Sequence, residues 1–388
     1  MARLLFVLHE ASRTGAPFTQ LHLMRWLKQH TQHKMLILLL KGGALEPEFA
    51  EVAQVHVVHP PYVPGQSLQI RAWNRLGQFY RSHEDRALAI ARAFQADLIF
   101  ANTAVALSYA ATLKQQLRLP LISSLHELEI TFYYCSATEF RRAAEQVDAF
   151  MMGSEAVQQY YIQQFEVEPA RTHLIYDFTG PVPAQLTPPA QDIRARYGLE
   201  PGTLLVGGMA TLIWRKGPEL FLTVAQQVAQ QLPNVHFIWV GGDPKSATYQ
   251  ELQRDVRLLG LQDRVTLAGN QADIASYYAA FDVFLLTSRE DPFPLVCLEA
   301  ALYETPVLCF ANSGGMPEFV RDDAGVVVPY LDTAAMAANT IALLQDERRR
   351  LQLGRTARQR VLDEHTIEAV GPAILHLIES TLSTSSAG

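Results

Sequence analysis

Two carboxylates and two prolines lie close together in the stretch Asp291–Glu299, whose sequence is DPFPLVCLE. The prolines make this loop rigid, and a helix is expected to begin near Pro294. The first amides of that helix, those of Leu295 and Val296, have no partner within the helix and are suited to bind a phosphate. Glu299 follows among apolar neighbours, where a carboxylate needs a partner such as a pair of sugar hydroxyls. The alternative is a surface glutamate on a helix with an aspartate in its first turn.

Two cations, Arg215 and Lys216, directly precede another expected helix start. Positive charge opposes the dipole at the start of a helix, and a bound diphosphate would offset that cost. A solvated basic turn is the simpler explanation of the same residues. At a third helix start, Gly15 and Ala16 are small enough to let a ligand approach the backbone, although a tight turn accounts for them equally well.

Short apolar runs alternate with amphipathic segments along the whole chain. Most runs are continuous stretches of Val, Ile, Leu and Phe, which is typical of strands buried on both faces of a parallel sheet. The expected strands are 3–8, 34–40, 55–59, 97–101, 119–123, 149–153, 172–176, 203–207, 235–241, 264–268, 283–287, 306–310 and 325–329. This alternation predicts an α/β fold of doubly wound parallel sheets.

A proline-rich segment divides the pattern, with four prolines in the ten residues from 180 to 189. Such a segment favours a stiff, extended connector between domains. The expected parts are an N-terminal Rossmann-like domain over 1–180, a linker over 181–189, a C-terminal Rossmann-like domain over 190–364, and a C-terminal helix with a disordered tail over 365–388. The C-terminal helix could pack back on the first domain. Two such domains would face a cleft at the carboxyl ends of their strands, where open α/β sheets bind ligands.

The composition is that of a globular protein. The chain has 388 residues, of which 49% are hydrophobic and 18% charged, and its net charge is −7. Nucleic acid is not expected as a partner, because phosphate binding normally requires a basic surplus. The three cysteines form no Cys-x-x-Cys pair, and the sequence has no convincing Asp-x-Asp and no His-Glu-x-x-His motif, so we expect no metal site.

The N-terminal sequence and the apolar runs bear on location. The start of the chain lacks a signal-peptide core of normal length and is better interpreted as a strand, and the apolar run 35–40 is too short to span a bilayer. We therefore expect a cytoplasmic protein. The helical segment Leu21–His30 carries Trp26 beside Arg25 and Lys28, which leaves open a peripheral contact with the inner face of a membrane. An amphipathic Rossmann helix explains this segment equally well.

The stretch Asp291–Glu299 resembles the Glu-x(7)-Glu motif of the retaining glycosyltransferases of family 4, in the glycogen-synthase-like superfamily. The resemblance extends over nearly the whole chain: the loop at Gly15, the loop at His126, the Arg-Lys-Gly turn and the sequence GGMPE at 314–318. It implies the GT-B fold and the metal-independent transfer of a sugar from a UDP- or GDP-sugar to a hydroxyl acceptor. A glycan, a lipid-linked sugar or a small molecule would serve as acceptor, as in polysaccharide biosynthesis.

The resemblance also implies roles for individual residues. Glu299 would hold the ribose, Asp291 the hydroxyls of the donor sugar, and the diphosphate would lie against Lys216 and the amides of the helix start. His126, Asp291 and Lys216 would be the catalytic residues, with His126 beside donor sugar and acceptor. The implied donor-binding residues are Gly15, Ala16, Arg215, Lys216, Gly269, Asn270, Asp291, Phe293, Pro294, Leu295, Val296 and Glu299.

This sequence departs from the family pattern at two places. The first acidic position is Asp291, one methylene shorter than the usual glutamate, with Glu290 adjacent. Where many members carry Gly-Arg before the lysine, this chain has Ala210 and Thr211. We infer that Arg215 replaces the missing cation.

The acceptor side is less well defined, and other functions compete. The stretches Arg71–Arg81 and Ile130–Tyr134 mix aromatic and polar groups that could stack on a sugar ring or touch a lipid headgroup, although helix packing also explains them. The alternatives to a transferase are a sugar-nucleotide epimerase or hydrolase of the same fold and a non-catalytic protein that binds nucleotide sugars. A nicotinamide-dependent oxidoreductase is disfavoured, because neither half carries Gly-x-Gly-x-x-Gly.

Overall fold

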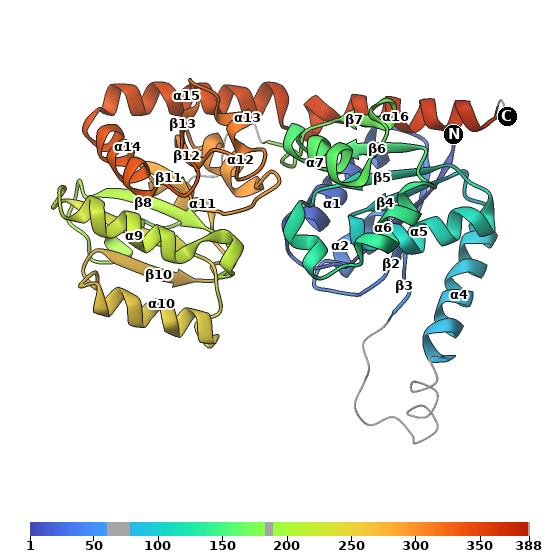
Figure 1. Cartoon of the computed structure of the whole chain (residues 1–388), viewed down its shortest axis with the longest axis horizontal. Helices are drawn as coiled ribbons and strands as arrows, with labels where there is room; N and C mark the ends of the chain where they lie inside the picture. The colour runs from blue at the N-terminus through green and yellow to red at the C-terminus, as the bar shows by residue number, and fades with distance from the viewer. Residues whose placement is uncertain (60–77, 183–188, 387–388) are drawn as a thin grey trace, which may run out of the picture. The chain divides into compact units, whose positions relative to one another are not determined.

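The structure is a computed structural model that describes residues 1–59, 78–182 and 189–386 (Figure 1). The chain forms two compact units. Unit 1 comprises Met1–Gly180 with Ile367–Gly388, and unit 2 comprises Pro181–Thr366. Each unit contains one parallel sheet with helices on its faces, so the predicted α/β fold is confirmed.

Unit 1 has a seven-stranded sheet in the order β3-β2-β1-β4-β5-β6-β7, all parallel. Its strands are β1 Arg3–Leu8, β2 Lys34–Leu39, β3 Gln54–Val57, β4 Leu98–Asn102, β5 Leu121–Leu125, β6 Ala149–Met152 and β7 Thr172–Leu174. Its helices are α1 Gly15–His30, α2 Glu46–Val52, α4 Gln78–Phe94, α5 Ala104–Leu117, η1 Glu129–Tyr133, α6 Ala137–Ala144, α7 Glu155–Phe165, η2 Pro169–Arg171 and α16 Ile367–Ser386.

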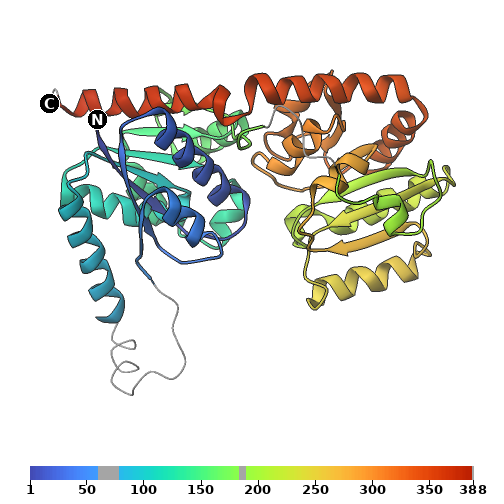
Figure 2. The same cartoon turned by 180° about the vertical axis from the view of Figure 1, so that it is seen from behind.

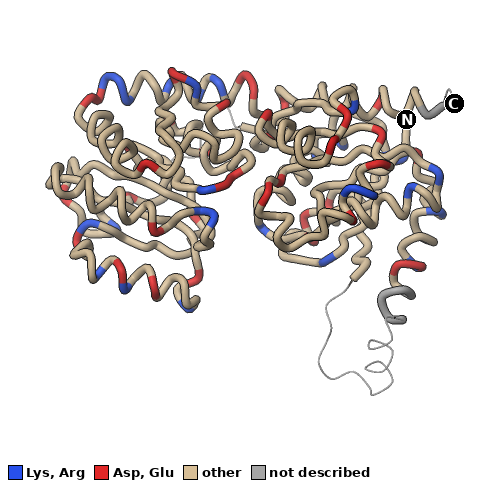
Figure 3. The backbone as a smooth tube through the Cα atoms, in the orientation of Figure 1, with Lys and Arg blue, Asp and Glu red and all other residues tan. Residues whose placement is uncertain are grey.

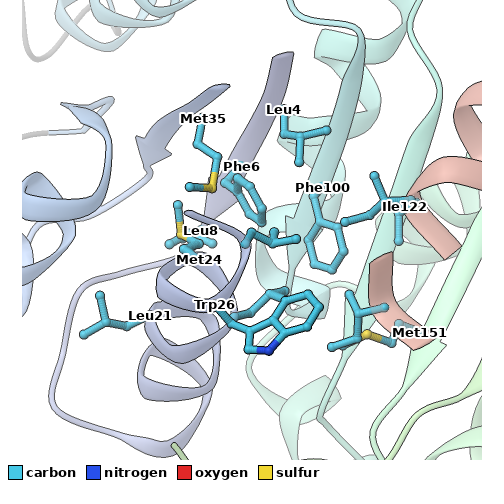
Figure 4. Close-up of a cluster of buried hydrophobic side chains, with 14 of the residues drawn as sticks. Leu4, Phe6, Leu8, Leu21, Met24, Trp26, Met35, Phe100, Ile122 and Met151 are labelled. Atoms are coloured by element: carbon cyan, nitrogen blue, oxygen red, sulfur yellow. The ribbon is translucent and has the colours of Figure 1, made fainter. Parts of the chain in front are cut away.

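Alternate residues of β1 enter the two hydrophobic cores of unit 1. Phe6 packs with Trp26 and other residues of α1, as Figure 4 shows, and the same core includes Ile374 of α16. Val7 points to the opposite face, whose core contains Leu107 of α5. Burial on both faces explains why the strands are predominantly apolar, because successive side chains of a strand point to opposite faces.

The C-terminal helix α16 runs along unit 1 in both views (Figures 1 and 2). It packs against α1 so closely that a Cβ atom at Gly371 would lie 2.6 Å from the Trp26 ring. The helix begins at Ile367, two residues after the start expected for this segment. His365 stays with unit 2, because its ring packs 5.2 Å from that of Phe293 and 5.4 Å from that of Phe319. Of the expected linker 181–189, the stretch 183–188 lies outside the described residues.

Unit 2 has a six-stranded parallel sheet in the order β10-β9-β8-β11-β12-β13. Its strands are β8 Leu204–Met209, β9 Val235–Val240, β10 Val265–Gly269, β11 Val283–Leu286, β12 Val307–Phe310 and β13 Gly325–Val328. Its helices are α8 Ile193–Arg196, η3 Trp214–Lys216, α9 Pro218–Ala229, α10 Ala247–Leu258, α11 Ala275–Ala280, α12 Leu295–Leu302, α13 Met316–Val320, α14 Thr333–Gln345 and α15 Glu347–Glu364.

Acidic and basic residues are interspersed along both units (Figure 3). Among the described residues, no helix combines the length and the apolar character needed to cross a lipid bilayer.

Candidate functional site

In unit 2, the acidic loop lies between β11 and α12, at the carboxyl end of its strand. The loop after the neighbouring strand β12 anchors it, because the Asp291 amide donates to the Ser313 carbonyl at 2.6 Å and the Gly315 amide donates to the Pro292 carbonyl at 2.8 Å. Gly314, with φ +129°, brings its backbone against the Asp291 carbonyl, where a Cβ atom would collide. The GGMPE sequence thus has a structural task, which is to hold the acidic loop in place.

Replacing Gly314 by alanine should destabilise unit 2 and move Asp291. An L-residue is strained at this φ, and the new methyl group would also overlap with main-chain atoms that cannot rotate away. We expect a loss of about 2 kcal/mol or more in unfolding free energy, measured by thermal or urea denaturation. Gly202→Ala is the matched control, because Gly202 has φ +86° but no atom within 4 Å of its added methyl group. Equal losses in both variants would contradict the close contact.

The cationic turn follows β8, the strand that pairs with β11. Lys216 Nζ forms an ion pair with Asp291 Oδ2, and Arg215 Nη1 lies 3.5 Å from Asp291 Oδ1. The Ser288 hydroxyl donates to the same carboxylate at 3.0 Å. The Arg289 amide donates to the Arg215 carbonyl at 2.7 Å, which joins the two loops through their main chains. Arg215 and Lys216 therefore share one buried carboxylate.

Burial and charge act in opposite directions on this ion pair. Burial alone would raise the pKa of Asp291, but the charges of Lys216 and Arg215 outweigh it and hold that pKa below its usual value. Burial lowers the pKa of Lys216, and Asp291 counteracts part of that change. The Asp291 side chain is only 5% exposed. In this structure Asp291 thus binds the two cations, a contact that the sequence analysis did not foresee.

Glu299 lies in the second turn of α12, where the Tyr278 hydroxyl donates to its Oε2 at 2.7 Å. Burial raises the pKa of Glu299, an effect that the Tyr278 hydrogen bond partly offsets. The helix begins at Leu295, next to the predicted Pro294, and no side chain caps it. The amides of Leu295 and Val296 head the helix as predicted, with both residues partly exposed. Phe293, in contrast, is buried and packs on His365.

Gly269 ends β10 and Asn270 follows it, beside the loop that leaves β9. The Gly241 amide donates to the Gly269 carbonyl at 2.8 Å, and the Gly242 amide donates to the Asn270 side chain at 3.0 Å. Gly241, Gly242 and Gly269 all have positive φ, a conformation that glycine adopts without strain. These two loops therefore form one connected edge at the carboxyl end of the sheet.

In unit 1, His126 follows β5 and is held on both ring nitrogens. Nδ1 lies 2.7 Å from Asp177 Oδ1, and Nε2 lies 2.9 Å from Asn102 Oδ1 and 2.8 Å from Ser124 Oγ. The Asn102 amide is oriented by donating to the Ala16 carbonyl at 3.4 Å. Ala16 and His126, two predicted site residues, are thus linked through Asn102. Gly15 begins α1 and is exposed.

The surroundings of His126 favour its protonated form. Burial would lower the pKa of His126, but the charge and hydrogen bond of Asp177 and the charge of Glu127 raise it above the usual value. Gly153 leaves room for the Asp177 carboxylate, because a Cβ atom at this position would come within 2.7 Å of Asp177 Oδ2. Sequence analysis missed Asp177, although its position shortly after the last strand of unit 1 could have indicated it.

The contribution of the His126–Asp177 pair to stability should fall as pH rises. Because the pKa of His126 is higher in the folded state, its protonation stabilises the fold. This stabilisation is complete below the unfolded-state pKa of about 6.5 and is lost as pH rises through the folded-state pKa. Thermal melting of the wild type and of Asp177→Asn should therefore differ more at pH 6 than at pH 9. Asp85→Asn, at an exposed site in the same unit, should show no such trend. A difference independent of pH would refute the charged pair.

The two candidate acceptor stretches have different outcomes. Ile130–Tyr134 comprises the last four residues of η1 and the residue after it, with Tyr133 68% and Tyr134 86% exposed, so both rings are accessible. The stretch Arg71–Arg81 lies outside the residues whose side chains the structure describes.

Comparison with known families gives one match in each unit. The model for "Glycosyltransferase Family 4" matches residues 15–179, and that for "Glycosyl transferases group 1" matches residues 200–346. Together these matches include the predicted site residues of both units.

Individual proteins are similar to the chain at moderate identity. A GDP-mannose-dependent monoacylated alpha-(1-6)-phosphatidylinositol monomannoside mannosyltransferase from Corynebacterium glutamicum is 25% identical over 70% of this chain and 73% of that protein. The lipopolysaccharide core biosynthesis glycosyltransferase LpsE of Rhizobium meliloti is 30% identical over 48% of this chain and 53% of its own length, so the chain spans only about half of that relative. Anabaena Alr3699/HepE, solved in complex with UDP-glucose, has 22% identity and a TM-score of 0.80 over 98% of this chain and 100% of its own.

The last similarity concerns the fold alone, whereas the family models match the sequence. With a family match in each unit, a common fold and glycosyltransferase relatives, the chain belongs to the family 4-like glycosyltransferases with the GT-B fold.

Proposed function

We propose that this protein moves a sugar from a nucleoside-diphosphate sugar to a hydroxyl acceptor, with retention of the anomeric configuration and without a metal cofactor. The observation that carries the proposal is the convergence of Lys216, Arg215 and the uncapped start of α12 around the acidic loop. Cations beside free helix amides suit a diphosphate. Relatives that use GDP-mannose and a fold neighbour crystallised with UDP-glucose support a donor of this class.

The leaving group determines what these residues contribute. As the bond between the sugar and the diphosphate breaks, negative charge grows on the diphosphate oxygen. Lys216, Arg215 and the amides of Leu295 and Val296 would stabilise that charge more in the transition state than in the ground state. We propose that these groups provide the positive charge that a bound divalent cation would supply in a metal-dependent enzyme.

Asp291 would share Lys216 with the substrate. An ammonium group has three donors, so Lys216 can keep its ion pair with Asp291 while it donates to a phosphate oxygen. Glu299 would accept hydrogen bonds from the ribose, and the loops at Gly269 and Asn270 would border the base, as the family resemblance implies.

Retention follows if the acceptor attacks the face from which the diphosphate departs. The acceptor oxygen forms the new bond to the anomeric carbon as the old bond breaks, and the acceptor proton passes to the departing phosphate. His126, held by Asp177 and Asn102, would position the donor sugar and the acceptor. We propose a sugar hydroxyl as acceptor, free or lipid-linked, and a cytoplasmic protein that meets a lipid-linked acceptor at the inner membrane face.

A binding panel followed by product analysis tests this function. Calorimetry with UDP, GDP, ADP and their sugars, each with Mg²⁺ or with EDTA, should identify one base whose binding does not require the metal. Incubation with sugar acceptors should then give a glycoside that has the donor's anomeric configuration by NMR. Rapid formation of an epimer or of free sugar without acceptor would favour an epimerase or hydrolase. Binding without any turnover would favour a non-catalytic protein.

A further inference from the structure

Trp214 is an exposed tryptophan at the cationic turn. It is 64% exposed and immediately precedes Arg215 and Lys216. A single apolar residue on a surface needs no explanation, but Trp214 is not alone. Its chain neighbour Ile213 is 43% exposed. Tyr330, which is 46% exposed, lies near Trp214, because the Tyr330 hydroxyl donates to the Arg289 carbonyl at 3.2 Å. The exposed ring therefore belongs to a group of side chains beside the candidate donor site.

The indole ring is fixed in place by Arg289. The guanidinium carbon lies 4.8 Å from the ring centroid, and Nη1 donates to the Trp214 carbonyl at 2.9 Å. The guanidinium is itself held by Glu219, whose Oε1 lies 2.5 Å from Nη1, and the Arg289 side chain is only 15% exposed. A cation stacked on one face leaves the rest of the ring open to solvent. The ring is thus pre-organised, which reduces the entropy that a ligand would have to overcome.

The same residues couple the ring to the donor site. The Arg289 amide donates to the Arg215 carbonyl, and Arg215 Nη1 donates to the Glu290 carbonyl at 3.1 Å. Because consecutive Cα atoms are about 3.8 Å apart, the Cα of Trp214 lies within about 7.6 Å of that of Lys216. A sugar on a diphosphate held by Lys216, or a sugar that approaches to receive it, would come close to this ring.

We propose that Trp214 is a stacking platform for a pyranose ring. One face of a pyranose presents C–H bonds, and the faces of an indole are electron-rich, so the two surfaces attract each other while the hydroxyls stay hydrated. A free diphosphate has no such face. The pyranose is either that of the donor or that of the acceptor, and the assignment rests on the proposed transferase function.

Binding measurements with Trp214→Ala, Trp214→Phe and the wild type test the platform. The donor probes are the sugar nucleotide that binds best among UDP-glucose, GDP-mannose and ADP-glucose, and the matching nucleoside diphosphate. The acceptor probes are the methyl pyranosides of glucose, mannose and galactose, added with saturating diphosphate. Leu258→Ala, which removes a 67% exposed side chain from the end of α10, is the control and should change no Kd.

The platform predicts a selective loss. If the donor sugar stacks, Trp214→Ala should raise the Kd of the sugar nucleotide about fivefold and leave the Kd of the nucleoside diphosphate unchanged. If the acceptor sugar stacks, Trp214→Ala should raise the Kd of a methyl pyranoside by a similar factor. Trp214→Phe should restore binding to within about twofold, because it keeps an aromatic face. Equal weakening of diphosphate and sugar nucleotide, or no change for any sugar, overturns the platform. A wild type that binds no nucleotide at all would instead contradict the proposed function.

Tryptophan fluorescence gives an independent readout. Of the other tryptophans that the structure describes, Trp26 and Trp239 are buried, at 7% and 2% exposed, so their emission should respond less to a ligand. Saturating sugar should shift the emission of the wild type, and Trp214→Phe should lose that shift. A shift that persists in Trp214→Phe counts against stacking on this ring.

Discussion

Replacing Lys216 by alanine should lower the rate of sugar transfer at least about 100-fold, the usual effect of removing a key electrostatic contact. The charge of Lys216 would act on the departing diphosphate, so kcat should fall together with kcat/KM. Steady-state kinetics with the best donor of the panel would measure both. Lys34→Ala, at an exposed position where β2 begins, should retain the wild-type rate. A Lys216→Ala enzyme with near-normal kcat would show that the diphosphate binds elsewhere.

The same substitution also affects folding, and pH separates the two effects. Without Lys216, the buried Asp291 keeps the Arg215 charge at 3.5 Å and the Ser288 hydroxyl at 3.0 Å, and breaking a buried pair costs about 3 kcal/mol. In the wild type the pKa of Asp291 is depressed, so its stabilisation is present above the unfolded value of about 3.9 and is lost as pH falls through the folded value. The stability deficit of Lys216→Ala should therefore stay constant between pH 7 and pH 4 and narrow as pH falls below about 3.9. The double variant with Asp291→Asn should recover part of the stability but none of the activity.

Replacing Glu299 by alanine should also lower transfer at least about 100-fold, and here the loss should lie in nucleotide binding. The half-buried carboxylate of Glu299 can accept from two ribose hydroxyls, hydrogen bonds that an alanine cannot make. The wild type should bind a nucleoside diphosphate more tightly than its 2′,3′-dideoxy analogue. In Glu299→Ala that preference should disappear, as calorimetry would show.

Two controls make the Glu299 test specific. Tyr278→Phe removes the hydrogen bond to Glu299 but leaves the carboxylate, so it should weaken nucleotide binding far less. Because burial raises the pKa of Glu299, the wild-type preference for ribose should decline as pH falls through a value above the usual glutamate range near 4.3. A preference for ribose that survives in Glu299→Ala would place the ribose away from α12.

Much of the fold could be predicted from local patterns. Continuous apolar runs identify strands that are buried on both faces, and the prediction succeeded because parallel strands leave no polar face to interrupt the run. The start of α12 was predicted within one residue, because the ring of proline restricts its own backbone whatever the tertiary contacts are. The errors lie at ends of elements, as at His365, where contacts with Phe293 and Phe319 decide which unit holds the residue.

The sequence by itself determined that Asp291 and Lys216 are candidates for one site, but not that they form an ion pair. They are 75 positions apart, and they meet because β8 and β11 are neighbours in the sheet, so that the loops after them emerge side by side. Likewise, Asn102 meets His126 because β4 pairs with β5. Apolar periodicity reports whether a strand is buried, but the order of strands depends on how all the elements pack together, and only the tertiary structure decides which side chains meet.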